Sequence, residues 1–247
     1  MTGSSRLDVD SLSSSLSSST FPEFGWFSRK NRLGLVQGIF AKYSKLGLSV
    51  QTDKPLAVAG LEYRLATYYR TLTVYGVFAK FLHETLLWRR GTDRLQPIDF
   101  PGKLKDRPPS WSWMAYTGGI DYLPVRDASS ASKTDVKFDY QKTSTRCALV
   151  APLWKVSMAT SLEKCEDTNF NLNEADSEDF YWVRYDDGRE LDGKKVDCLE
   201  FIPILNFESG FIYGLLVEFI NHEYRRVGIA SVQKLPDDYI ADKIRVI

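Results

Sequence analysis

The stretch that most constrains this chain is residues 107–122, with the sequence RPPSWSWMAYTGGIDY. Pro108 and Pro109 fix their own φ angles and disfavour the helical conformation in the residue before them, so any upstream helix has to end before this stretch. We expect extended backbone after the prolines. In extended backbone the two-residue period puts Trp111 and Trp113 on the same face.

Trp111, Trp113 and Tyr122 are the candidate binding residues. One interpretation buries both indoles in the core, where each finds a partner for its N–H group. The other makes them an exposed platform for a sugar, a base or a peptide. We favour the buried interpretation, because buried tryptophan is the commoner outcome in folded proteins.

The sequence predicts an α+β fold, with an N-terminal helical lobe packed on a C-terminal antiparallel β-sandwich or barrel. Apolar residues at three- and four-residue spacings indicate a helix over 31–45, and a second helix begins at 52–53 with Pro55 in its first turn. Strand-like runs then follow one another without intervening helices. These runs are 136–140, 146–158, 180–185, 195–205, 211–220, 224–232 and 243–247.

The second helix is predicted to be buried over a wide face, because apolar residues occupy two of its flanks. These residues are Leu61, Leu65 and Tyr68 on one flank and Leu56, Ala59, Tyr63 and Ala66 on the other. The segment 77–88 fits either a third helix or a helical turn that runs into a strand.

Composition divides the chain into three parts. Residues 1–22 are rich in serine and predict a disordered tail. Residues 23–106 form the helical lobe and residues 107–247 the antiparallel β-rich domain. The aromatic segment 21–27 joins the tail to the helical lobe, and we expect it to contact the folded body.

Charge and cysteine content limit the classes of partner. Residues 1–126 hold 17 Lys and Arg against 10 Asp and Glu, and the rest of the chain is acidic by the same margin. We attribute this asymmetry to attraction between the two halves and expect neither a nucleic-acid nor a membrane partner. Cys147, Cys165 and Cys198 show no C-x-x-C spacing, which favours a reducing compartment, and we expect a cytoplasmic protein.

Motifs for catalysis and metal binding are missing from the sequence. There is no G-x-S-x-G, P-loop, G-x-G-x-x-G or H-E-x-x-H pattern, so we expect no enzyme activity and no cofactor. His83 and His222 lack a supporting acid and nucleophile motif. An EF-hand-like spacing is interpreted as chance, because a leucine replaces the glycine of the calcium loop. Its members are Asp167, Asn169, Asn171, Asn173 and Glu178.

A series of short motifs resembles a known family. The first group is Leu86-Leu87-Trp88, Pro109-Ser110-Trp111-Ser112-Trp113, Gly119-Ile120 and Tyr122. Further segments of the series are 48–54, 57–61, 75–78, 213–216 and 224–228. In this order they resemble the region that follows the HET (heterokaryon incompatibility) domain in filamentous-fungal proteins.

The resemblance runs from about residue 48 to the end and implies a non-enzymatic interaction or regulatory module with a protein partner, acting in non-self recognition. Residues 1–47 do not contain the HET domain itself. The NAD chemistry proposed for that domain is therefore not carried over to this chain.

Three alternatives stay open at the level of sequence. A carbohydrate- or small-ligand-binding β-domain predicts exposed Trp111 or Trp113 in a groove. A hydrolase predicts His83 or His222 in a pocket beside a serine or cysteine. The third alternative is a truncated relative of HET-domain proteins that has no autonomous role.

Overall fold

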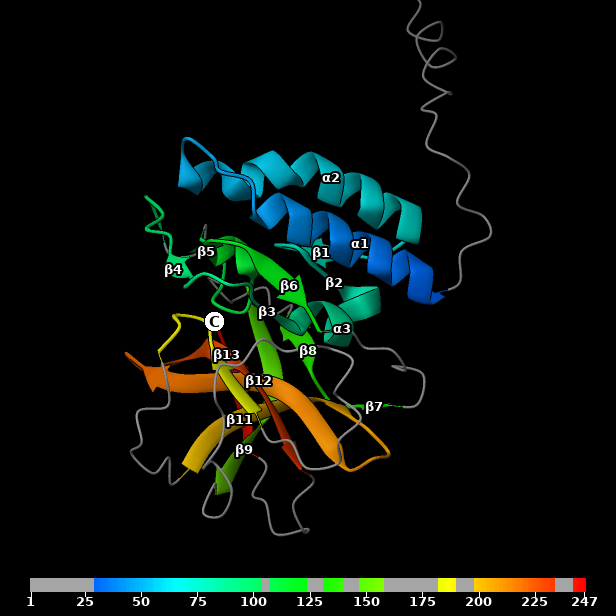
Figure 1. Cartoon of the computed structure of the whole chain (residues 1–247), viewed down its shortest axis with the longest axis vertical. Helices are drawn as coiled ribbons and strands as arrows, with labels where there is room; N and C mark the ends of the chain where they lie inside the picture. The colour runs from blue at the N-terminus through cyan, green and yellow to red at the C-terminus, as the bar shows by residue number, and fades with distance from the viewer. Residues whose placement is uncertain are drawn as a thin grey trace, which may run out of the picture.

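A computed structural model describes residues 29–103, 107–123, 131–139, 147–157, 182–189, 198–233 and 242–247. Two helices lie side by side over one end of a large β-sheet (Figure 1). Short strands lie between this pair of helices and the large sheet. This arrangement confirms the predicted α+β class. The EF-hand-like residues 167–178 lie outside the described ranges.

The helices begin and end close to the predicted positions. They are α1 (Arg29–Ser44), α2 (Lys54–Tyr69) and the short α3 (Leu82–Leu86), with 3₁₀ turns at Gln51–Asp53, Ala79–Phe81 and Trp113–Ala115. Pro55 lies in the first turn of α2, where its missing N–H leaves no hydrogen bond unmade. Arg70 ends α2 in the left-handed conformation, at a φ of 49°.

The prediction of a wide buried face on α2 is wrong. The buried positions of α2 form a single stripe that faces α1 and the strands: Lys54, Val58, Glu62, Leu65 and Tyr69. Leu56 and Tyr63, which were expected in the core, are 77% and 73% exposed. Polar Lys54 and Glu62 take core positions because each has a hydrogen-bond partner there.

Short strands connect the helical lobe to the larger sheet. The hairpin-like pair β1 (Thr73–Val74) and β2 (Val77–Phe78) precedes α3. Strand β3 (Trp88–Arg90) pairs with β6 (Ile120–Tyr122), and β4 (Gln96–Pro97) pairs with β5 (Tyr116–Thr117). Both of these pairings join segments on opposite sides of residue 107, where the sequence predicts the start of the β-rich domain.

The large sheet closes on itself as a barrel. Its strands are β9 (Ala148–Ser157), β11 (Cys198–Asn206), β12 (Phe211–Ile220), β13 (Glu223–Gln233) and β14 (Asp242–Val246). They pair in the order β9-β11-β12-β13-β14, and β14 returns to β9. The β13–β14 pairing is parallel, so the predicted all-antiparallel arrangement is wrong at this one position.

Three further strands extend the barrel sheet. Strand β7 (Ser132–Lys133) pairs with β11, β8 (Lys137–Asp139) with β9, and β10 (Trp182–Tyr185) with β13. Strand β13 therefore has different neighbours along its length, since β10 pairs with it at residues 228–231 and β14 at residue 224. Hydrogen bonds from Arg226 to the Leu86 and Trp88 carbonyls place the early residues of β13 at the junction with the helical lobe.

Candidate functional site

The PSWSW segment makes a tight turn instead of an extended strand. Ser112 Oγ accepts a hydrogen bond from the Met114 N–H at 3.0 Å and donates to the Tyr75 carbonyl at 2.7 Å. These bonds begin the 3₁₀ turn at Trp113–Ala115. Because the backbone turns between the two indoles, the prediction that they share a face is wrong.

Trp111 and Trp113 belong to two separate hydrophobic clusters. Trp111 packs with Phe138 and the barrel residues, and its ring centroid is 5.8 Å from that of Phe138. Trp113 packs with residues of α1 and α2, at 5.6 Å from the Phe40 ring. One short segment thus anchors the barrel core with one indole and the helical core with the other.

Both indoles are 0% exposed, so the prediction of an exposed tryptophan platform is wrong for Trp111 and Trp113. The burial agrees with the core interpretation. The expectation that each N–H finds a partner is wrong, since within the described residues neither Nε1 has a hydrogen bond. Tyr122 is half-buried, and its hydroxyl is also buried without a described partner, while burial raises its pKa.

A buried ion pair lies directly beside these residues. The Arg226 side chain is fully buried, and it donates from Nε to Asp186 at 3.0 Å and from Nη2 to the other carboxylate oxygen at 3.3 Å. Two further donors reach the main-chain carbonyls of Leu86, at 3.0 Å, and of Trp88. The guanidinium also lies over the Trp88 ring, with Cζ 3.2 Å from the ring centroid.

This ion pair joins the sequence motifs that carried the family resemblance. Trp88 Nε1 donates to the Trp111 carbonyl at 2.9 Å. The Arg226 main-chain N–H donates to Ser110 Oγ at 3.0 Å, and Tyr116 donates to the Ser110 carbonyl at 3.1 Å. Residues from LLW, PSWSW and YRRVG therefore form one cluster, which we call the arginine cluster. Asp186 completes the cluster, and no local sequence pattern predicts this role.

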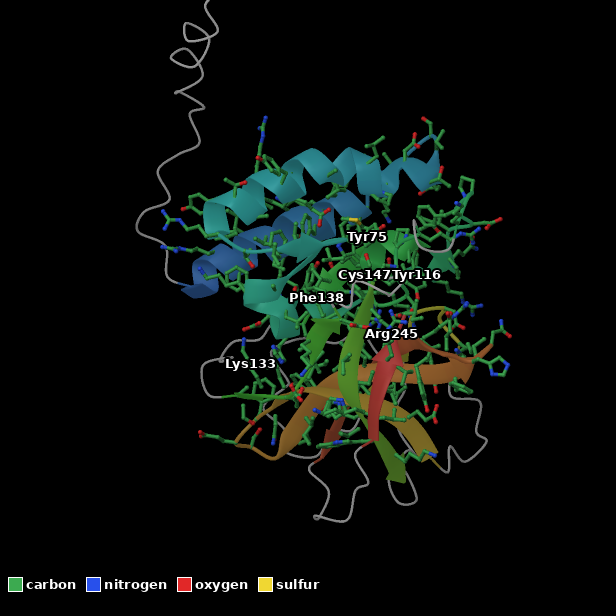
Figure 2. The ribbon with its side chains drawn as sticks, turned by 180° about the vertical axis from the view of Figure 1, so that it is seen from behind. Tyr75, Tyr116, Lys133, Phe138, Cys147 and Arg245 are labelled. Atoms are coloured by element: carbon green, nitrogen blue, oxygen red, sulfur yellow. The ribbon has the colours of Figure 1, made fainter. Side chains whose placement is uncertain are left out.

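A cavity of about 450 Å³ opens on the outer side of the arginine cluster. Tyr116, Asp186 and Arg226 form part of its wall, and Tyr116 is labelled at the junction of the helical lobe and the barrel in Figure 2. The apolar part of the lining comes from the chain between β3 and β5, from the end of β12 and from β13. It includes Leu95, Pro97, Ile98, Phe100, Pro108, Ile220 and Val227.

Three partly exposed arginines stand at this cavity: Arg107, Arg189 and Arg225. Arg189 is paired with Glu218 at 2.9 Å and Arg225 with Glu223 at 3.4 Å. Arg107 has a weaker partner, because its distance to exposed Asp99 is 3.7 Å and its buried Nε has no hydrogen bond among the described residues. Arg107 is thus the cation best placed to receive a carboxylate from outside.

The two histidines stand apart from this cavity. His83 Nε2 is 2.9 Å from the Thr134 carbonyl, and burial lowers its pKa. His222 lies in the turn between β12 and β13 with its ring against Phe219. Within the described part of the chain, neither imidazole is hydrogen-bonded to a serine or cysteine.

Among the described residues, no group of three or more His, Cys, Asp or Glu side chains is arranged to hold a metal ion. No helix in the described ranges has the length and apolar character needed to cross a membrane. Comparison with protein-family models, with curated proteins and with solved structures finds no match to this chain.

Proposed function

We propose that this chain is a non-catalytic interaction module, of the kind that follows the HET domain in filamentous-fungal proteins, and that it acts in non-self recognition. One observation carries the proposal. The motifs behind the resemblance are far apart in sequence, yet they meet in the arginine cluster through Trp88, Ser110 and Arg226. Their spacing therefore corresponds to a specific structural unit.

The cavity beside the arginine cluster is the proposed contact surface for a protein partner. Its apolar walls would receive an aliphatic or aromatic side chain, which is the usual anchor of a protein interface. Arg107 and Arg225 would pair with a carboxylate on the partner. The rigid ion pair below holds this surface in one shape, which reduces the ordering cost of binding.

The test of this proposal uses charge reversal at the cavity. Arg107→Glu and Arg225→Glu change partly exposed side chains, whereas Lys155→Glu changes an exposed lysine on β9 as a control. Each variant is expressed in a filamentous fungus, and cell death after fusion with an incompatible strain is measured. We expect the unchanged chain and Lys155→Glu to alter the amount of cell death after fusion. We expect the two arginine variants to leave cell death unaltered. If neither the unchanged chain nor any variant alters the response, the proposal is wrong.

A small-ligand-binding domain is the second candidate, and the size of the same cavity favours it. About 450 Å³ falls within the range of roughly 300–1,000 Å³ that is typical of ligand sites. The ligand would have to contact Phe100 and the arginines, since Trp111 and Trp113 are buried. Thermal-shift measurements with carboxylated small molecules and glycans test this candidate. A shift that persists in Arg107→Glu would place the ligand elsewhere.

We also propose a cytoplasmic location. Cys147 carries a free thiol in a half-buried position, and burial raises its pKa to about 11. A protonated thiol of this kind is stable in a reducing compartment. Imaging of the fluorescently tagged chain in the same fungal strains tests the location, and a signal confined to the secretory pathway would contradict it.

A further inference from the structure

The outer face of α2 carries large apolar side chains that no described residue covers. Leu56 and Tyr63 are two helical turns apart on this face and are 77% and 73% exposed. Leu72, in the segment after α2, is 62% exposed. Apolar side chains gathered in this way on one helix mark a contact surface more often than isolated exposed leucines do.

A shallow groove of about 650 Å³ runs along this face. One side is the middle and C-terminal part of α2, with Ala59, Tyr63 and Ala66, and the other is the segment 70–73. Glu62 lies at the base, where its carboxylate is already occupied by the Thr73 hydroxyl at 2.8 Å and the Gly76 N–H. The groove, which we call the α2 groove, therefore offers an apolar surface with no free buried charge.

We propose that the aromatic segment 21–27 of this same chain, FPEFGWF, binds in the α2 groove. The described chain begins at Arg29, and the first turn of α1 is next to the last turn of α2. The Tyr69 hydroxyl donates to the Arg32 carbonyl at 3.3 Å, which fixes this proximity. The segment is therefore attached close to the end of α2 that forms the groove.

The length of the segment is sufficient to reach the groove. Seven extended residues span roughly 23 Å at about 3.3 Å each. The path from α1 to the groove has to cross the end of α2, and a helix with its side chains is about 10–12 Å wide. The remaining length covers the roughly 10 Å between Tyr63 and Arg70 along the helix axis.

The chemistry of the segment matches the groove. Four of the seven residues are aromatic, Phe21, Phe24, Trp26 and Phe27, and such side chains gain most from burial against Tyr63 and Leu72. Glu23 is the only charged residue of the segment, and exposed Arg70 lines the groove. A covalent connection also removes most of the entropy cost of association, which favours this occupant over a separate molecule.

Trp26 provides a reporter in the full-length chain. The other tryptophans, at positions 88, 111, 113, 154 and 182, are buried, so acrylamide reaches Trp26 first. The groove variant is Tyr63→Asp, which places a charge on an exposed site. The matched control is Leu46→Asp, which also replaces an exposed apolar side chain but lies outside the α2 groove. Equal melting temperatures of the two variants would establish that both are folded.

Hydrogen exchange of the amides in 21–27 and acrylamide quenching are then measured in the unchanged chain and both variants. We expect about tenfold slower exchange than in a free peptide for the unchanged chain and for Leu46→Asp, with loss of this protection in Tyr63→Asp. Exchange at the free-peptide rate in the unchanged chain would overturn the proposal and leave the groove to a separate partner. Protection that rises with protein concentration would overturn the proposal and assign the groove to a second copy of the chain. Protection that persists in Tyr63→Asp would also overturn the proposal.

Discussion

The guanidinium of Arg226 lies over the Trp88 indole, with Cζ 3.2 Å from the ring centroid, and its edge donates to both carboxylate oxygens of Asp186. Both charged side chains are buried, so neither can be solvated if the other is removed. The pair joins β13 to the turn after β10 and, through main-chain carbonyls of α3 and β3, to the helical lobe. It is the polar centre of an otherwise apolar junction.

Replacing Arg226 with methionine should lower the free energy of unfolding by about 3–5 kcal/mol, because Asp186 is then a buried charge without its partner. Urea unfolding followed by tryptophan fluorescence measures the change. Arg225→Met is the matched control, since Arg225 is partly exposed and its ion pair with Glu223 contributes at most about 1 kcal/mol. Equal losses in the two variants would show that the buried ion pair does not stabilise the junction.

Replacing Ser110 with alanine should destabilise the protein by about 1–3 kcal/mol. The Ser110 hydroxyl accepts from the Arg226 N–H and donates to the Ile247 carbonyl, so its removal leaves a buried donor without a partner. The exposed Ser132, which donates to Asn206 at 3.4 Å, is the control, and Ser132→Ala should change stability by less than about 0.5 kcal/mol. The shift in the thermal midpoint of each variant decides between these outcomes.

Gly76→Ala should be strongly destabilising, because the position excludes a side chain for two reasons. Its φ is +82°, and an added Cβ would lie 2.4 Å from Trp113 Nε1. Left-handed strain and overpacking together cost about 2–5 kcal/mol. Gly60→Ala is a control of opposite sign, since a Cβ there meets nothing within 4 Å and alanine favours the exposed helix by up to about 1 kcal/mol. A tolerated Gly76→Ala, measured by urea unfolding, would contradict the described packing of Trp113.

Local rules predicted the elements well, because their determinants are close together in sequence. Pro55 marked the start of α2, and the run FIYGLLVEFI became β12 at Phe211–Ile220, with the predicted bounds. The segment 77–88 combines parts of its two predicted alternatives, because the short helix α3 covers Leu82–Leu86 and strand β3 begins only at Trp88. These features depend on propensity and periodicity within a few residues.

Long-range features could not be read from the sequence. Arg226 and Asp186 are 40 residues apart, and no local pattern distinguishes Asp186 from its exposed neighbour Asp187. The turn between Trp111 and Trp113 depends on the bond from Ser112 to Tyr75, which only the folded chain brings together. Hydrophobicity alone predicts that the exposed face of α2 lies in the core, because it cannot show where the layers of a fold end.

Lys54 makes the stability of the helical lobe depend on pH. Its side chain is 2% exposed, its Nζ donates to the Tyr116 carbonyl at 2.6 Å, and burial lowers its pKa from 10.5 to about 8. Between these two values the unfolded chain binds more protons than the folded chain at this site, so the free energy of unfolding rises with pH. Below pH 8 both states are protonated and the contribution is constant.

The expected gain from this site is about 2 kcal/mol between pH 7 and pH 9.5. Urea unfolding of the unchanged chain and of Lys54→Met over this range gives the site's contribution as the difference between the two curves. The difference is needed because burial also raises the pKa of Tyr116 and of Cys147. These two groups lower the free energy of unfolding as the pH rises, and they do so in both proteins. If the two curves run parallel, Lys54 is not held in a desolvated state and its predicted role in the helical lobe is wrong.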